Sequence, residues 1–152
     1  GADGQLRQSI GAERDDWLDL ILTTRVAPRF EPHRLTVLRH YPTSQAALAR
    51  LCPNDSRVAD RFEVFFGAVE LANGYVELVD AEEQAVRIER DNEERRRRGR
   101  TVRPHDSKLL AALESGLPAC AGVAVGFERL QMIVADTEDI RDVITFCFET
   151  AP

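Results

Sequence analysis

The sequence predicts a domain of the α+β class, in which an antiparallel sheet is flanked by helices. Two apolar, β-rich segments, residues 62–66 and 69–72, are separated by Gly67-Ala68, and this pattern is typical of a hairpin. Helical periodicity appears later in the chain, first after Asp80 and again after Asp106. Strands paired by a hairpin, with helices inserted after them, indicate an antiparallel sheet with helices beside it.

The region before the hairpin contributes a helix and a short strand. Apolar residues recur at helical spacing over residues 12–26, and Pro28 is expected to end that helix. Leu35 and Val37 then mark a strand that leads to Tyr41.

The region after the hairpin is mainly helical. Asp80 followed by Glu83 resembles a capping box, and it opens a helix that continues to about Arg98, where Gly99 supplies a stop. The remaining elements are a helix between residues 106 and 116, a strand over 121–127 that feeds a helix, and an apolar run over 140–148.

The composition narrows the classes of function. The 152 residues are enough for one domain with its own core. A net charge of −6 and a pI near 5.1 make the chain as a whole a poor electrostatic partner for nucleic acid. No apolar run reaches membrane length. Cys52, Cys120 and Cys147 are odd in number and far apart, and the three histidines lack metal-ligand spacing, so a reducing cytoplasm fits better than a disulfide framework or a zinc site.

One basic island stands out against this acidic background. It comprises residues 95–98, followed by Arg100 and Arg103. The simplest interpretation places these cations at the C-terminal end of a helix, where the helix dipole favours them. Recognition of an acidic protein or of RNA is the alternative.

Glu63 and Glu70 are predicted to project from the same face of the hairpin. If the turn is at residues 66–67, Glu63 lies opposite Glu70. If the turn is at residues 67–68, Glu63 lies opposite Ala72 and Glu70 is diagonal to it. Carboxylates this close repel each other unless a cation such as Mg²⁺ lies between them or one is protonated. The alternative is two exposed acids on the surface, screened by water.

Glu77 presents a different pattern. It lies seven residues beyond Glu70, an odd number, so in an unbroken strand it faces the other way, together with Asn73 and Tyr75. These residues can share a pocket with Glu70 only if the strand twists or bulges near Gly74. An amide, an aromatic ring and a carboxylate together suit a ligand with an ammonium group, and a capped turn with an exposed Glu is the alternative.

Residues 122–129 combine small side chains with a basic residue. Gly122, Ala124 and Gly126 occupy every second position of a strand, which lets a flat ligand lie against the backbone. Arg129 follows at the start of a helix, where it can stack on a base or meet phosphate charge. A tightly packed strand with a surface arginine is the alternative.

Together these segments resemble the catalytic domain of class II aminoacyl-tRNA synthetases, in particular the lysine branch. Residues 122–129 are similar to the third motif of that class, Gly-x-Gly-x-Gly-x-(Asp/Glu)-Arg, and residues 62–80 and 140–144 are similar to segments of the lysine branch. Within that branch, residues 41–50 and Ala124, where lysyl-tRNA synthetases carry Gly, are closer to the short paralogues that modify elongation factor P.

The resemblance implies an enzyme that activates lysine or β-lysine with ATP and Mg²⁺, and then transfers the aminoacyl group to a lysine of elongation factor P. By the family pattern, Mg²⁺ is held by Glu63 and Glu70. The implied ATP contacts are Glu70, Leu71, Gly126 and Arg129, the last also being the catalytic residue. The implied amino-acid pocket is lined by Asn73, Tyr75, Glu77 and Ala124, with Glu77 taking the side-chain ammonium.

The resemblance also implies a division of the chain. Residues 1–33 are expected to form an N-terminal tail and helix, and residues 34–152 the C-terminal part of the catalytic domain. The first motif of the class, at the dimer interface, and the second, whose arginine binds the α-phosphate, are not recognisable in this sequence. We therefore expect the chain alone to be weakly active or inactive, and an exposed sheet edge to favour self-association or a partner chain.

Two other functions are compatible with the sequence. The less favoured of the two is tRNA charging, with the chain as a fragment of a lysyl-tRNA synthetase, because we expect no room in the chain for an anticodon-binding domain. A non-catalytic module that uses the fold for binding or assembly is the stronger one, because two motifs of the class are missing.

Overall fold

The computed structural model describes residues 10–104 and 107–147. These residues form two compact units, which we describe separately. Unit 1 comprises the described residues within 1–38, 62–73 and 123–152, and unit 2 comprises those within 39–61 and 74–122. The predicted division at residue 33 stays a prediction, and the features expected at residues 106 and 148 lie outside the described residues.

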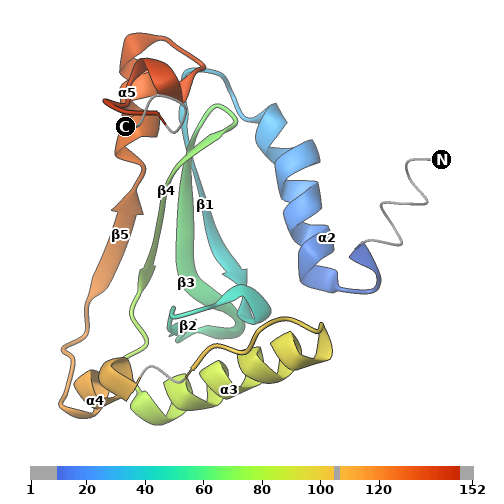
Figure 1. The fold of residues 1–152 in the computed structure, drawn as a ribbon, viewed down its shortest axis with the longest axis vertical. Coiled ribbons are helices and arrows are strands. Elements are labelled where there is room, and N and C mark those ends of the chain that lie inside the picture. The colour runs from blue at the N-terminus through green and yellow to red at the C-terminus, as the bar shows by residue number, and fades with distance from the viewer. Residues whose placement is uncertain (1–9, 105–106, 148–152) are drawn as a thin grey trace. The chain divides into compact units, whose positions relative to one another are not determined.

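The sheet confirms the predicted α+β class. Its strands follow the order β1-β3-β4-β5, and β2 pairs antiparallel with β3 (Figure 1). The strand bounds are Leu35–Pro42 for β1, Leu51–Cys52 for β2, Asp55–Phe66 for β3, Val69–Val76 for β4 and Ala121–Val125 for β5. Each of the four long strands has residues in both units.

Two parts of the sheet were not predicted. β3 begins at Asp55 rather than at Phe62, and β2 precedes it. Acidic and basic residues interrupt the apolar pattern over residues 51–61, so the segment lacks the alternation that marks a strand. The extension is stabilised instead by pairing between β2 and β3, in which Leu51 lies opposite Ala59.

The turn between β3 and β4 follows the second of the two predicted alternatives. β3 ends at Phe66 and β4 begins at Val69, so Gly67 and Ala68 form the connection. Gly67 has a φ of +53°, which the first position of a type II′ turn requires and glycine adopts without strain. Its N–H donates to the carbonyl of Arg34 at 3.2 Å, which fixes the turn within unit 1.

The helices of unit 1 are α2 (Arg14–Ile21) and α5 (Phe127–Ala135). The helical segment after α2 differs from the prediction, because it does not stop before Pro28. It continues as a π-helical turn over Leu22–Val26 and a 3₁₀ turn over Ala27–Arg29 that contains the proline. The hydroxyl of Thr24 donates to the carbonyl of Leu20 at 2.6 Å, and such bonds compete with regular helical pairing.

Unit 2 contains α3 (Ala81–Arg97) and α4 (Ser107–Glu114). The predicted cap of α3 is confirmed, because the carboxylate of Asp80 accepts from the N–H of Glu83 at 2.9 Å. Gly99 follows the helix with a φ of +65°, as a stop residue does. Among the described residues, no helix is both long and apolar enough to cross a membrane.

The basic island lies at the end of α3, as its simplest interpretation predicts. Arg97 and Arg98 both pair with Glu94, and Arg96 pairs with Glu89. Hydrogen bonds from Arg97 and Arg98 lower the pKa of Glu94 to about 2, well below its ordinary value. Arg95 donates to the carbonyl of Thr101 at 2.7 Å. These arginines are therefore engaged in local contacts at the helix end.

Asn92 ties α3 to the segment that follows it. Its side chain is 1% exposed, and its amide nitrogen donates to the carbonyl of Arg103 at 2.9 Å. Its amide oxygen accepts from the N–H of Arg103 at 3.0 Å. The side chain thereby pairs with a backbone peptide much as a neighbouring strand does.

Candidate active site

The first part of the predicted site lies where β4 meets the start of α5 in unit 1. The N–H of Gly126 donates to the carbonyl of Leu71 at 2.8 Å. Nη1 of Arg129 donates to the carbonyl of Glu70 at 2.7 Å and lies 3.6 Å from the Glu70 carboxylate. The four residues that the resemblance assigns to ATP are therefore brought together by direct contacts.

Gly126 leaves the space that Arg129 occupies. A Cβ atom at this position would lie 3.3 Å from Cδ of Arg129 and 3.5 Å from the carbonyl oxygen of Leu71. The backbone of Gly126 has an ordinary φ of −71°. The missing side chain, and not an unusual backbone conformation, therefore gives room to the arginine, which would have to shift slightly to accommodate a Cβ here.

Glu63 and Glu70 have different surroundings. Glu63 is 8% exposed, and its Oε1 accepts from the side-chain amide of Asn73 at 3.1 Å. The side chain of Glu70 is 40% exposed and faces Arg129. The alternative of two exposed surface acids is therefore wrong for Glu63. A buried carboxylate needs partners, and Asn73 is one of them.

The bond between Glu63 and Asn73 bears on the irregularity predicted near Gly74 in β4. With a turn at residues 67–68, a regular ladder places Ala72 opposite Glu63 and turns Asn73 to the other face. The observed bond requires Asn73 to lie on the face of Glu63. Leu71 and Ala72 are adjacent and both buried, which also departs from regular alternation. Between β4 and β5, however, the bonds from Gly126 to Leu71 and from Glu77 to Cys120 belong to one antiparallel register, so the irregularity predicted near Gly74 stays a prediction.

Ala124 lies beside Asn73 in unit 1. The bond from Gly126 to Leu71 sets an antiparallel register between β5 and β4, and in this register Ala124 is opposite Asn73. All five residues of β5 are exposed. On β5, the position opposite Asn73 is therefore an exposed alanine, which contributes one methyl group.

The second part of the predicted site lies in unit 2, around Glu77. The N–H of Glu77 donates to the carbonyl of Cys120 at 3.0 Å, and this antiparallel register places Gly122 opposite Tyr75. The Glu77 carboxylate reaches over the glycine, because Oε1 lies 3.5 Å from the point that a Cβ of Gly122 would occupy. This position holds a carboxylate beside bare backbone.

Segments on both sides hold the backbone of Glu77. Cys120 lies on one side, and on the other Ala49 forms a bridge with Glu77 itself. The bridge is framed by bonds from Arg50 N–H to the carbonyl of Val76 (2.8 Å) and from Leu78 N–H to the carbonyl of Leu48 (2.9 Å). Although Glu77 lies one residue beyond β4, its position is therefore fixed from both sides.

Tyr75 contributes to packing as well as to this surface. Its ring packs against a cluster of three buried alanines, Ala46, Ala49 and Ala59. Burial raises the pKa of the Tyr75 hydroxyl, and the charge of Glu77 raises it further. Both effects favour the protonated form of the hydroxyl.

The structure places the predicted pocket residues in both units, Asn73 and Ala124 in unit 1 and Tyr75 and Glu77 in unit 2. Their convergence on one ligand stays a prediction. In each unit a polar residue of β4 lies opposite a small residue of β5. These pairs are Asn73 with Ala124 in unit 1 and Tyr75 with Gly122 in unit 2.

Comparison with known proteins identifies the family. Residues 21–150 match the model of the tRNA synthetases of class II (D, K and N). The chain belongs to this family. The predicted similarity to class II synthetases is thereby confirmed over most of the chain, with β4, β5 and α5 inside the matched region.

The names of the curated relatives are more specific than the description of the family. It is 48% identical over 139 residues to a protein of Klebsiella pneumoniae subsp. pneumoniae, and 50% identical over 133 residues to one of Proteus mirabilis. Both relatives are named elongation factor P–(R)-β-lysine ligase. The matches cover 91% and 88% of this chain, but the chain spans only 43% and 41% of the relatives.

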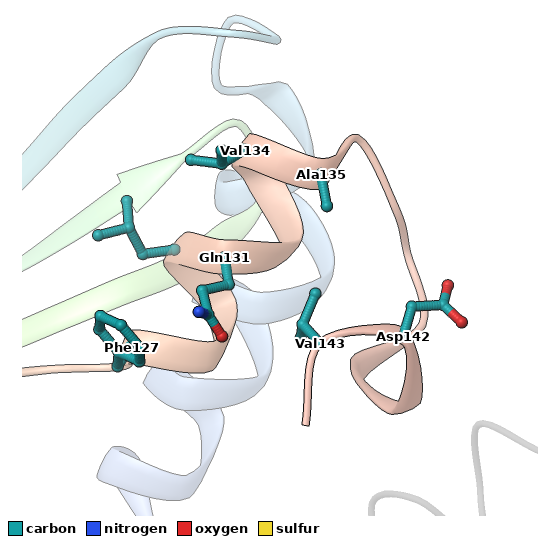
Figure 2. A pocket seen from close by; sticks show the side chains of 7 residues that line it. Phe127, Gln131, Val134, Ala135, Asp142 and Val143 are labelled. Atoms are coloured by element: carbon teal, nitrogen blue, oxygen red, sulfur yellow. The ribbon is translucent and has the colours of Figure 1, made fainter. Parts of the chain in front are cut away.

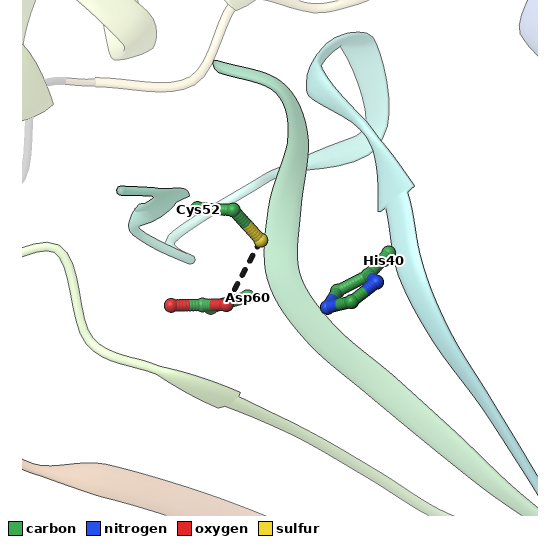
Figure 3. A group of neighbouring side chains, drawn as sticks. All are labelled: His40, Cys52 and Asp60. Carbon is green, nitrogen blue, oxygen red and sulfur yellow. Dashed lines mark hydrogen bonds between the residues drawn. The ribbon is translucent and has the colours of Figure 1, made fainter. Parts of the chain in front are cut away.

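A polar cluster in unit 2 of this class II chain was not predicted. Donor atoms of His40, Cys52 and Asp60 lie within 4.8 Å of one another (Figure 3). The Cys52 thiol donates to Asp60 at 2.9 Å, and Arg50 binds the other oxygen of that carboxylate at 2.7 Å. Spacings of twelve and eight residues match no metal motif, so only the fold could reveal the cluster.

The chemistry of this cluster is that of a hydrogen-bonded network. Burial and the hydrogen bond to Asp60 raise the pKa of the Cys52 thiol to about 11, so the thiol stays protonated, whereas a metal needs the thiolate. The guanidinium of Arg50 further occupies the carboxylate. The absence of a zinc site from this chain therefore stays a prediction, and the contacts within this cluster are compatible with it.

A second feature that was not predicted is an open groove of about 540 Å³ in unit 1. It lies between α5 and the 3₁₀ turn η4 (Ile140–Asp142), with Phe127, Gln131 and Val134 on the helix, and Val143 points toward the helix from the other side (Figure 2). None of the predicted site residues lines it. The groove is therefore separate from the candidate active site.

Proposed function

We propose that this chain forms part of the active site of an ATP-dependent ligase, which activates β-lysine or lysine as an adenylate and transfers it to a lysine side chain of elongation factor P. The observation that carries the proposal is the placement of Glu77, a carboxylate held from both sides and lying over the bare backbone of Gly122. The names of the relatives support the same substrate class.

The nucleotide is assigned to unit 1. Arg129 supplies a cation whose position is set by the Glu70 carbonyl, and Gly126 leaves the adjoining surface free of side chains. We assign phosphate binding to Arg129, and contacts with the nucleotide to Glu70 and Leu71. A guanidinium suits this role, because its charge is permanent and its donors match phosphate oxygens.

The metal is assigned to Glu63 and Glu70. Their chemistry fits Mg²⁺, which prefers oxygen ligands and is commonly bound by one or two carboxylates together with substrate phosphates. When bound, Mg²⁺ supplies positive charge to the phosphate oxygens. Asn73 donates to Oε1 of Glu63 and so helps to orient that carboxylate.

The amino acid is assigned to Asn73, Tyr75, Glu77 and Ala124. Glu77 pairs with the side-chain ammonium of the substrate, and the ring of Tyr75 borders it. Ala124 lies opposite Asn73 and adds one methyl group where lysyl-tRNA synthetases carry Gly. A single methyl group shifts the preference between related substrates by about 1–3 kcal/mol, which is enough to separate β-lysine from lysine.

The chain is assigned only part of the complete site. Because it spans about two fifths of its curated relatives, we propose that residues outside these 152 complete the catalytic machinery, and that the 152 residues alone are weakly active or inactive. We expect the reaction to take place in the cytoplasm, where the thiols of the three cysteines remain reduced. The acidic net charge makes tRNA a poor ligand for this chain.

We also propose that the chain self-associates, as a dimer in the simplest case. Within unit 1, Val123, Val125 and Phe127 are 56%, 55% and 63% exposed, and Val134 is 81% exposed. β5 lies at one end of the strand order, so within the described part of the chain no strand pairs with its outer edge. Exposed apolar groups beside an edge strand favour association.

Two measurements test these proposals. Titration with ATP and Mg²⁺ is expected to show binding, and absence of binding together with a stable oligomer would instead favour a non-catalytic assembly module. ATP–pyrophosphate exchange with lysine and β-lysine tests the incompleteness of the chain. Robust exchange by the 152 residues would overturn that part of the proposal, and charging of lysine tRNA would revive a tRNA-charging function.

A further inference from the structure

Arg87 of α3 is the feature that the proposed function leaves unexplained. Its side chain is only 12% exposed, which is unusual for an arginine on a helix surface. Nη1 donates to two backbone carbonyls, that of Ala49 at 2.6 Å and that of Ala47 at 3.2 Å. Nε donates to the carboxylate of Glu83, one turn earlier on the helix, at 3.0 Å.

The carbonyl of Ala49 depends on this guanidinium. Ala49 is 0% exposed, and its N–H donates to the carbonyl of Ala46 at 2.8 Å. On the side of Ala49 that faces Glu77, the bridge uses the groups of Leu48 and Arg50. The carbonyl of Ala49 points away from that bridge and is satisfied by Arg87, and a buried carbonyl without a partner is costly.

The turn that Arg87 holds is also strained. Ala47 has a φ of +49°, a left-handed conformation that a residue with a Cβ adopts only at a cost. Such a conformation persists where surrounding contacts determine it. The guanidinium bonds the carbonyls on both sides of Leu48, and Leu48 in turn accepts from the N–H of Leu78, next to Glu77.

We infer that Arg87 is a positioning residue for the amino-acid pocket: it fixes the 47–49 turn, and the turn fixes the backbone of Glu77. Every contact in this chain of bonds lies within unit 2. The link to substrate binding rests on the proposed role of Glu77. Arg87 itself need not touch the substrate, so its loss is expected to weaken binding of the amino acid without affecting ATP.

The structural half of the inference can be tested without any ligand. In Arg87→Met, amide hydrogen exchange at Arg50 and Leu78 is expected to accelerate at least about tenfold, because their bonds frame the bridge to Glu77. Arg90→Met is the matched control, since Arg90 lies on the same helix and is exposed. It should leave both amides unchanged. Arg87→Lys keeps a cation and should restore part of the protection.

The functional half uses titrations of the same variants with lysine, β-lysine and Mg²⁺–ATP. Arg87→Met is expected to raise the Kd for the amino acids about tenfold and to leave the Kd for ATP unchanged. Arg87→Lys should be intermediate and Arg90→Met should match the original chain. A simple loss of folding would weaken ATP binding as well.

The two failures are distinguishable. Unchanged exchange at Arg50 and Leu78 in Arg87→Met overturns the inference whether or not the chain binds lysine. Faster exchange with undiminished lysine affinity also overturns it, since the turn would then not govern the pocket. If the original chain binds neither amino acid, the proposed function fails, whatever the exchange result.

Discussion

Replacing Asn92 by alanine should destabilise unit 2 measurably. The substitution removes two hydrogen bonds, of 2.9 and 3.0 Å, from a side chain that is 1% exposed. Each bond contributes about 1 kcal/mol net, and orphaned partner groups add to the loss if water cannot reach them. Arg103 is itself exposed, so its peptide groups can be partly rehydrated. We therefore expect a loss of about 2 kcal/mol.

The assay is urea unfolding followed by circular dichroism, with the free energy of unfolding extrapolated to water. Arg90→Ala, an exposed change on the same helix, serves as the control and should stay within about 0.5 kcal/mol of the original chain. Asn92→Asp should cost at least as much as Asn92→Ala, because it places a second acceptor against the Arg103 carbonyl. An Asn92→Ala variant as stable as the control would refute the assigned contribution of these two bonds.

Three further predictions concern the site and its surroundings. Glu77→Gln should weaken lysine binding at least about tenfold in a calorimetric titration and leave ATP binding unchanged, because the charge-assisted pair is lost; equal weakening of both ligands would contradict this. Glu70→Gln should weaken the Mg²⁺ dependence of ATP binding, because one of the two proposed carboxylate ligands is lost, and an unchanged dependence would place the metal elsewhere. In a thiol-labelling assay at pH 8, exposed Cys120 should react and Cys52 should not, because the pKa of Cys52 is raised to about 11. The ordinary pKa of a cysteine thiol, 9.0, applies to the unfolded chain. The stabilisation that protonated Cys52 contributes to the folded state is therefore fully present below pH 9 and is lost as the pH rises toward 11. Unfolding midpoints of the original chain and of Cys52→Ala, compared at pH 8 and pH 10.5, should show this loss.

Local signals in the sequence were sufficient for several elements of the fold. Asp80 and Glu83 predicted the start of α3, and the cap forms between them. Gly67 predicted the turn between β3 and β4, because few residues other than glycine adopt the conformation it needs. These features depend on residues close together in the chain, which is why the sequence alone could predict them.

Tertiary contacts determined what the sequence could not. β2 and the first half of β3 are charged segments stabilised by pairing with each other, and no periodicity marks them. The bonds from Arg87 to Ala47 and Ala49 join residues about forty positions apart. A search for local motifs cannot find such a contact, although it determines how rigidly a predicted site residue is held.

The candidate site shows the same division. Gly126 and Arg129 were predicted from a motif, and the structure brings both to β4. The contact between Glu63 and Asn73 departs from the register expected for a regular hairpin, and no local signal in the sequence predicted it. The burial of Glu63 was also not predictable, because it depends on which elements cover that face.

The most direct test of the proposed function compares lysine with norleucine, which has the same carbon chain without the side-chain ammonium group. Both are titrated calorimetrically into the chain in the presence of Mg²⁺ and ATP. Because Glu77 is proposed to pair with that ammonium, lysine should bind at least about tenfold more tightly, and Glu77→Gln should remove the difference. Equal affinities for lysine and norleucine in the original chain would contradict the assignment of a lysine-type substrate to this site.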